Sequence, residues 1–538
     1  MRDAPNTAGP VPAAVPVVAP PRAPRVRLML AALSGAALAA AFAPLNLWPL
    51  GFLCPAVLIW LWQAVSPREA ARLGFAFTTA TFIAGTYWLY YSIHVLGQAP
   101  IWLALALMLA LAAIMGLYHA ALGYACARWL PRGGALRWLV AVPAAWLVVE
   151  WWRGWFLGGF SWLSLGYSQS DTWLAGYAPL LGVYGMSALL LVMAGAIAML
   201  VLERAPRARL IAAVVFVLPW LGGAALYRHS WTVPAGAPVS VAVIQGAIPQ
   251  DEKWLESNRD YTLNLYQTMT EQVLGTKLIV WPESAPADLA NELVPYISNL
   301  YRETRAHGST LVTGILRADP GPEAEPRYYN SVLSMDAKPE WYDKAHLVPF
   351  AEFFPVPAFV RQWLKLRSLP YSDFTPGAAV QPALNAAGLK LGTTICYEDA
   401  YGSAMLPVLR QADALVNVTN DAWFGHTSAR HQHLQISRLR ALEAGRYMVR
   451  AANDGISAVL GPHGEVIARA AEFVPTKLVS SIIPMQGLTP YARVGNYPVV
   501  MLALLALAYG LWVRNDRRRR PQGLGRAGSS LDSSGSGS

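Results

Sequence analysis

Charged side chains are scarce in this chain and are missing altogether from two long stretches. Only 14% of its 538 residues are charged, whereas 55% are hydrophobic, which is too apolar for an ordinary soluble protein. No Asp, Glu, Lys or Arg occurs from Leu28 to Pro67 or from Leu73 to Ala127. Because a helix needs about 20 apolar residues to cross a bilayer, each stretch has room for two spans. The sequence therefore predicts a membrane protein.

Cysteine is also rare, and this excludes a disulfide framework. Cys54, Cys126 and Cys396 are the only three, and the first two fall within predicted spans, so Cys396 is expected to remain a free thiol. The formal net charge of +10 does not indicate a nucleic-acid partner, because the excess arginines flank the apolar runs instead of forming a basic face.

The apolar runs predict eight membrane-spanning helices. They cover residues 28–44, 48–65, 73–92, 101–127, 138–153, 174–202, 210–227 and 497–513. Arginines concentrate in the links on one side, and by the positive-inside rule this side and both termini are cytoplasmic. We expect a disordered arm over residues 1–27 and a basic, Gly/Ser-rich tail over 514–538.

Residues 228–496 lie between the seventh and eighth predicted spans and carry most of the acidic side chains. The topology places this segment outside the cytoplasm. Short apolar runs alternate there with helical patterns, which predicts a separate α/β domain built on layered sheets. The predicted strands are 239–244, 277–280, 309–313, 330–334, 389–395, 414–417 and 457–460, and the predicted helices are 257–274, 287–306 and 427–445.

Three predicted strand ends in this domain carry different ionisable groups: Glu283, Lys344 and Cys396. Together they form a complete set for acyl transfer. The Cys396 thiolate attacks an ester or amide carbonyl, Glu283 takes the thiol proton, and Lys344 stabilises the oxyanion with help from the backbone N–H of Tyr397.

Each of these residues also has an ordinary structural interpretation. A lone cysteine beside β-branched residues is usually core packing, Glu283 after Trp-Pro can cap a helix, and Lys344 alone can be a solvated charge. The functional interpretation depends on all three occurring together. His346 and His431 lack ligand spacing with other His or Cys residues, so we expect no metal and no cofactor.

The motifs resemble the nitrilase, or carbon-nitrogen hydrolase, superfamily, whose members use a Glu-Lys-Cys triad. The resemblance is closest to a membrane branch, the apolipoprotein N-acyltransferase family, and covers residues 28–513. It is carried by the eight-span layout and by the segments 159–168 (GFSWLSLGYS), 342–350 (YDKAHLVPF), 396–398 (CYE) and 417–425 (NVTNDAWFG). It implies an αββα, nitrilase-like sandwich as the extracytoplasmic domain.

The resemblance also implies a reaction at the outer face of a bacterial inner membrane, with the catalytic domain in the periplasm. Cys396 would accept an acyl chain from a phospholipid, expected to be phosphatidylethanolamine, and pass it to the α-amine of a diacylated apolipoprotein. Glu352, Tyr397 and Glu398 match family positions needed near the nucleophile, and Trp254 matches a family tryptophan on a mobile loop. Ala351 departs from the expected Gly before Glu352.

Two other functions fit the residues alone. One is a membrane-tethered nitrilase or amidase that hydrolyses its acyl-enzyme with water. The other is a catalytically silent transporter of lipids or lipoproteins in which the triad is vestigial. Only the products of the purified protein separate these possibilities.

Overall fold

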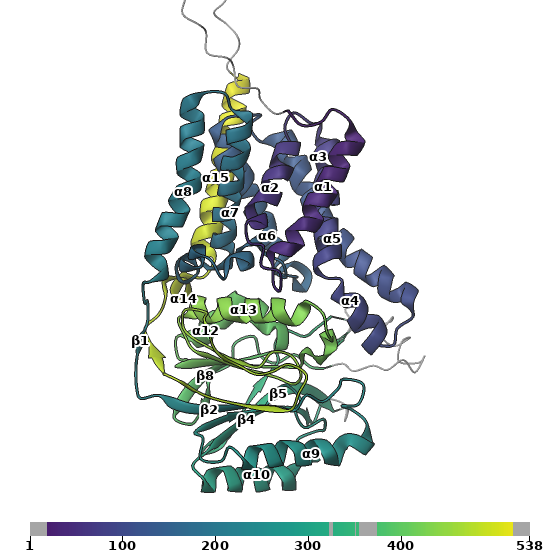
Figure 1. Ribbon diagram of the computed structural model, residues 1–538, viewed down its shortest axis with the longest axis vertical. Helices are drawn as coiled ribbons and strands as arrows, with labels where there is room; N and C mark the ends of the chain where they lie inside the picture. Colours follow the sequence, from purple (N-terminus) through teal and green to yellow (C-terminus); the bar gives the residue numbers. More distant parts are fainter. Residues whose placement is uncertain (1–18, 322–325, 350, 354–373, 520–538) are drawn as a thin grey trace, which may run out of the picture.

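A helix occupies each predicted apolar run in the computed structural model, which describes residues 19–321, 326–349, 351–353 and 374–519 (Figure 1). These helices are α1 (Pro24–Leu38), α2 (Leu50–Leu61), α3 (Pro67–Gly85), α5 (Ile101–Trp129), α6 (Val142–Arg153), α7 (Ala178–Leu202), α8 (Pro206–Tyr227) and α15 (Tyr497–Arg519). Among the described residues, five helical segments are long and apolar enough to cross a membrane, namely those around α1, α5, α7, α8 and α15, whereas α2 is a shorter apolar helix.

The first and last of these helices extend beyond the predicted spans. Helix α1 begins at Pro24, inside the predicted arm, because proline suits the first turn of a helix. Arg27 in its first turns pairs with Glu69 of α3 at 2.8 Å. Helix α15 continues to Arg519, inside the predicted tail. The rest of the arm (1–18) and of the tail (520–538) lies outside the described residues.

The chain between α8 and α15 contains two six-stranded sheets. One has the order β12-β11-β10-β9-β8-β7 and the other the order β13-β2-β3-β4-β5-β6. The strands of the first are β7 (Leu384–Ala386), β8 (Leu389–Ile395), β9 (Ala414–Thr419), β10 (Met448–Ala452), β11 (Ala458–Leu460) and β12 (Val466–Arg469). Those of the second are β2 (Val239–Gln245), β3 (Leu278–Val280), β4 (Thr310–Asp319), β5 (Arg327–Met335), β6 (Pro339–Asp343) and β13 (Thr476–Ile482).

The two sheets face each other across an apolar core. β-Branched residues of both, among them Val241, Val280, Val416 and Val449, are completely buried in this core. Helices α9 (Glu256–Glu271) and α10 (Val294–Ala306) cover the outer face of the β2 sheet, and α12 (Gly402–Leu409) and α13 (Ala429–Ala444) cover that of the β8 sheet (Figure 1). The domain is thus the predicted αββα sandwich, and each predicted strand and helix is present.

Helix α13 lies between the β8 sheet and the membrane-type helices (Figure 1). One side packs through Leu434 and Ala441 into the core below it, and the other packs through Ile436 and Leu439 into the core of the helical bundle. Most of its side chains are buried although many are polar. Buried polar groups need partners, and those of α13 connect the bundle to the sandwich.

Candidate active site

The three predicted catalytic residues come from both sheets and meet between them. Glu283 follows β3 and Lys344 follows β6, both in the β2 sheet, whereas Cys396 directly follows β8 in the other sheet. Parallel neighbours β2, β3 and β4 bring their carboxyl ends to one edge. Strand β6 runs antiparallel to β5, which runs antiparallel to β4, so its carboxyl end lies at the same edge.

Lys344 is buried between two carboxylates. Its Nζ lies 3.3 Å from Glu283 Oε1 and 2.8 Å from Glu352 Oε1. Asn330 of β5 donates its amide to the same two oxygens, at 2.7 Å and 3.0 Å. Burial lowers the pKa of Lys344, but the attraction of Glu283 and Glu352 outweighs it and holds the pKa above its ordinary value. Lys344 is therefore a fixed positive charge.

Glu283 is held at both its carboxylate and its main chain. The backbone N–H of Asn420 donates to Oε2 at 2.9 Å, and the buried ammonium of Lys253 donates to the main-chain oxygen at 3.1 Å. Gly314 lets β4 approach, since a Cβ there would lie 2.5 Å from the Cα of Glu283. The next residue, Ser284, has φ of 47°, a conformation that costs roughly 1–2 kcal/mol. The Glu283 carboxylate is therefore held firmly in place.

Cys396 stands at a sharp turn where β8 becomes a short 3₁₀ helix (Cys396–Ala400). Its φ is 53°, which is unusual for a residue with a side chain and is found at functional sites. Burial and the Glu283 carboxylate raise the pKa of the Cys396 thiol well above its ordinary range, while Lys344 and a hydrogen bond with Thr419 oppose them. The resting thiol is therefore neutral and needs a base.

The predicted supporting acid Glu398 is used structurally. It accepts hydrogen bonds from the backbone of Ala345 and His346 on one oxygen (2.7 and 2.9 Å) and from Ile395 and the Tyr342 hydroxyl on the other (2.8 and 3.0 Å). These donors lie on both sides of Lys344 and next to Cys396, so Glu398 joins the two sheets at the site.

Two further predicted residues differ in how closely they approach these groups. The Tyr397 ring centroid is 6.0 Å from Lys344 Nζ, and its hydroxyl donates to the Leu347 carbonyl at 2.9 Å. Trp254 is 50% exposed, and no contact among the described residues joins its ring to the triad. Ala351 is exposed, and the methyl group that replaces the expected Gly leaves Glu352 within reach of Lys344.

Sequence reasoning missed several residues that touch these groups. Asn330 and Lys253 contact the acids, and Asn417 Nδ2 and His433 Nε2 lie 3.0 and 3.2 Å from the main-chain oxygen of Cys396. Lys253 adjoins the predicted Trp254, and Asn417 opens one of the motifs quoted above, so both had a signal in the sequence. His433 had none, because it lies within a helix of otherwise ordinary polar pattern.

Comparison with known families divides the chain in two. Residues 34–197 match the apolipoprotein N-acyltransferase N-terminal domain, and residues 240–493 match the carbon-nitrogen hydrolase family. The second match coincides with the sandwich and the first with the helical bundle. The αββα domain is therefore nitrilase-like.

Solved structures of that superfamily are similar to part of this chain. Nit3 of Saccharomyces cerevisiae is 19% identical and covers 46% of this chain and 90% of its own, with a TM-score of 0.34. A carbon-nitrogen hydrolase of Helicobacter pylori is 16% identical and covers 53% of this chain and 99% of its own, also with a TM-score of 0.34.

Curated relatives match nearly the whole chain. The apolipoprotein N-acyltransferase of Chromobacterium violaceum is 41% identical over 91% of this chain and 95% of its own length. That of Azotobacter vinelandii is 39% identical over 92% of this chain and 96% of its own length. These matches confirm the resemblance predicted from the motifs: the chain belongs to the apolipoprotein N-acyltransferase family.

Proposed function

We propose that this protein transfers a fatty acyl chain from a phospholipid to the N-terminal amine of a diacylated apolipoprotein, through a thioester on Cys396. Glu283 and Lys344 complete the catalytic triad. The observation that carries the proposal is the convergence, from two sheets, of a buried ammonium and a carboxylate on a neutral cysteine thiol. This is the set of groups that thioester chemistry requires.

The first half-reaction releases a lysophospholipid. Glu283 takes the proton from the Cys396 thiol as the sulfur attacks the ester carbonyl, because the raised pKa of that thiol leaves it protonated. The resulting oxyanion lies against Lys344 and the backbone N–H of Tyr397. When the tetrahedral intermediate collapses, the C–O bond breaks and Glu283 returns its proton to the departing alkoxide.

The second half-reaction forms the amide. The α-amine of the diacylglyceryl-cysteine attacks the thioester carbonyl, and Glu283 accepts a proton from the amine. The C–S bond then breaks, and Glu283 gives the proton to the departing sulfur of Cys396. Each transfer is thus served by the same base, and the cycle restores the neutral thiol and the carboxylate with which it began.

The supporting residues have distinct proposed roles. Glu352 keeps Lys344 charged and centred, since it forms the shorter of the two ion pairs. Glu398 fixes the backbone on both sides of the site, and Tyr397 packs over Lys344. Trp254 is half exposed, and we assign it to contact with a lipid substrate, because an exposed indole suits an interface between water and hydrocarbon.

We further propose that the protein lies in a bacterial inner membrane with residues 228–496 in the periplasm and both termini in the cytoplasm. The arginines in alternate links support this orientation. An impermeant maleimide applied to intact spheroplasts should label Cys396, which is partly exposed. Cys54 and Cys126 are buried and should not react, so the label reports Cys396. A Cys396→Ala control should remain unlabelled. Labelling only from the cytoplasmic face would show that the orientation is the reverse of the one proposed.

The activity test uses the purified full chain with phosphatidylethanolamine and a diacylglyceryl-cysteine peptide. We expect an N-acylated peptide, a lysophospholipid, and a thioester on Cys396 that mass spectrometry detects and that Cys396→Ala lacks. Free fatty acid without acylated peptide would identify a hydrolase. The absence of any thioester in the wild-type chain would support a transporter. Replacing phosphatidylethanolamine by phosphatidylglycerol tests the expected donor.

A further inference from the structure

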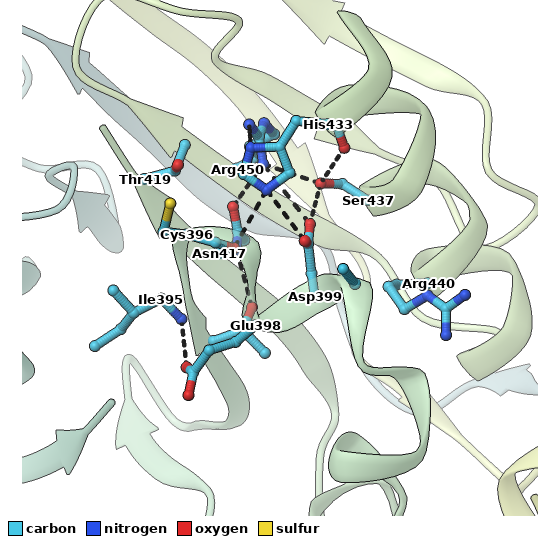
Figure 2. A network of polar contacts seen from close by, with 12 residues as sticks. Ile395, Cys396, Glu398, Asp399, Asn417, Thr419, His433, Ser437, Arg440 and Arg450 are labelled. Atoms are coloured by element: carbon cyan, nitrogen blue, oxygen red, sulfur yellow. Dashed lines mark hydrogen bonds and ion pairs between the residues drawn. The ribbon is translucent and has the colours of Figure 1, made fainter. Parts of the chain in front are cut away.

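A buried network of charged and polar side chains adjoins Cys396 (Figure 2). Its charged members are Asp399, Asp421, His433 and Arg450, and all four are essentially inaccessible to solvent. Asp399 lies in the 3₁₀ helix after Cys396, Arg450 on β10 and His433 on α13. The acyl-transfer steps described above use none of them.

The network reaches Cys396 at two places. Thr419 donates to Asp421 Oδ1 at 3.1 Å and shares a hydrogen bond with the Cys396 thiol, and two further groups contact the main-chain oxygen of Cys396. Asn417 Nδ2 donates to that oxygen at 3.0 Å, and His433 Nε2 lies 3.2 Å from it (Figure 2). In a planar trans peptide the C=O of one residue and the N–H of the next point in opposite directions. Holding the Cys396 oxygen toward α13 therefore directs the Tyr397 N–H to the other side.

The surroundings of His433 fix its charge. Nδ1 lies 2.9 Å from Asp421 Oδ1, and Nε2 lies 3.1 Å from Asp399 Oδ1. Because carboxylate oxygens only accept, both ring nitrogens carry protons. Arg450 Nη2 is also 3.0 Å from Nδ1 and repels the charge, but Arg450 binds the other oxygen of Asp421 at 2.7 Å. The network thus contains two cations and two anions.

The pKa of His433 agrees with this charge. Burial and the charge of Arg450 lower it, but Asp399 and Asp421 more than compensate and raise the pKa to about 9. The other polar neighbours are uncharged: Ser437 donates to Asp399 Oδ2, and the indole of Trp162 lies with its ring centroid 5.8 Å from that of His433. The imidazolium form persists at neutral pH.

We propose that His433 is a positioning residue whose imidazolium, by donating to the Cys396 carbonyl, orients and polarises the following peptide so that the Tyr397 N–H stabilises the oxyanion. The inference rests on the proposed function. A carbonyl that accepts a charged hydrogen bond makes the N–H of the same peptide a stronger donor, because hydrogen bonds in a chain polarise one another. The strained φ of 53° at Cys396 makes such fixing necessary.

Helix α13 is well placed for this role because it cannot shift easily. The residue before His433, Gln432, accepts hydrogen bonds from the indoles of Trp162 (2.7 Å) and Trp88 (3.3 Å) in the helical bundle. Gln432 and His433 thus tie the helix to the bundle on one side and to the nucleophile on the other. The bundle therefore contributes to the geometry of the nucleophile.

The test compares two reactions of the same sulfur. Acylation by phosphatidylethanolamine forms an oxyanion, whereas alkylation by iodoacetamide is a direct displacement that forms none. In His433→Gln we expect acylation of Cys396, followed by mass spectrometry, to slow about 10- to 100-fold, and alkylation to stay within about twofold of wild type. The control His431→Gln, a partly exposed position on the same helix, should leave both rates unchanged.

Three outcomes are decisive. Selective loss of acylation supports the positioning role. Equal slowing of both reactions means that His433 only keeps the sulfur in place, and an unchanged acylation rate means that it does not contribute; either result overturns the inference. If the wild-type chain itself forms no thioester, the proposed function fails instead, so the two failures are distinguishable.

A second variant and a measurement on the wild-type chain guard against misfolding of His433→Gln. Asn417→Ala removes the other donor to the Cys396 oxygen without removing a charge, and the same selective loss is expected. In the wild-type chain, the ratio of acylation to alkylation should fall as the pH rises through about 9, where His433 loses its proton, and it should fall more steeply than in His433→Gln, in which the Cys396 thiol and Lys253 still titrate. A constant ratio across this range contradicts the inference.

Discussion

Two clusters of buried charges flank Cys396, and they differ in charge balance. The front cluster, Glu283, Lys344 and Glu352, sets one ammonium against two carboxylates and comes from the β2 sheet and the chain that follows it. The rear cluster, Asp399, Asp421, His433 and Arg450, sets two cations against two carboxylates and lies on the side of the β8 sheet and α13.

The difference in charge balance supports the proposed mechanism, in which only the front cluster exchanges protons. The front cluster has one more carboxylate than it has cations. When that carboxylate accepts a proton, the remaining carboxylate and the Lys344 ammonium balance each other, so no buried charge is left uncompensated. The rear cluster is already balanced, and a proton gained or lost would leave an uncompensated buried charge, which costs several kcal/mol. The front cluster therefore suits chemistry, and the rear cluster suits positioning.

The largest effect should come from removing the cation of the front cluster. We expect Lys344→Met to slow acylation of Cys396 by about 1,000-fold, because it removes an oxyanion donor and leaves Glu283 and Glu352 without the cation they share. The measurement is the rate of thioester formation from phosphatidylethanolamine. The control Lys338→Met, at an exposed lysine, should react normally. A loss below about tenfold would show that Lys344 is not an oxyanion donor.

The next largest effect should appear in stability rather than rate. Arg450→Met leaves Asp421 short of a cation in a site without solvent, and breaking a buried pair costs about 3 kcal/mol. The midpoint of thermal unfolding in detergent should fall clearly. Arg469→Met is the matched control, because its pair with Glu472 is at the surface, with 42% of the Arg469 side chain exposed, and such pairs contribute little. Equal midpoints for the two variants would mean that the rear cluster is not a stabilising unit.

A smaller loss of acylation rate is expected from replacing Lys253. Its ammonium donates a hydrogen bond to the main-chain oxygen of Glu283 and not to the Glu283 carboxylate. Lys253→Met should slow acylation about tenfold by releasing the base from its position. Stability should change little, because burial already disfavours this cation and lowers its pKa to about 8. Lys477→Met, at an exposed lysine, is the control. If stability falls while the rate is preserved, Lys253 supports only the fold.

Glu283 and Lys344 of the front cluster could be predicted because they stand at predicted strand ends within recognisable motifs, whereas Glu352 could be predicted only from the family resemblance. The structure brings both Glu283 and Glu352 into contact with Lys344. The layered sheets could also be predicted, since their central strands are continuous apolar runs. Strands β6 and β10 could not, because polar residues such as Glu340 and Arg450 interrupt their patterns.

The rear cluster could not be predicted for a related reason. Its charges lie on separate elements, and each looks like an ordinary surface residue of its own helix, turn or strand. Helix α13 has the composition of an exposed helix, and only the bundle above it makes it buried. The burial of α13 therefore depends on tertiary contacts, and no local pattern in the sequence predicts it.

The last effect is a pH dependence of stability that comes from the rear cluster. The pKa of His433 is raised from 6.5 to about 9, so the folded state binds this proton more tightly than the unfolded chain, and the resulting stability is fully present below pH 6.5 and is lost as the pH rises through 9. The difference in unfolding midpoint between wild type and His433→Gln should accordingly be largest near pH 6 and shrink toward pH 9. The groups facing His433 are Asp399, Asp421 and Arg450, and comparison of the two proteins at each pH cancels titrations elsewhere in the chain. A difference that grows with pH would mean that His433 is neutral in the folded protein, and the rear cluster would then not be balanced.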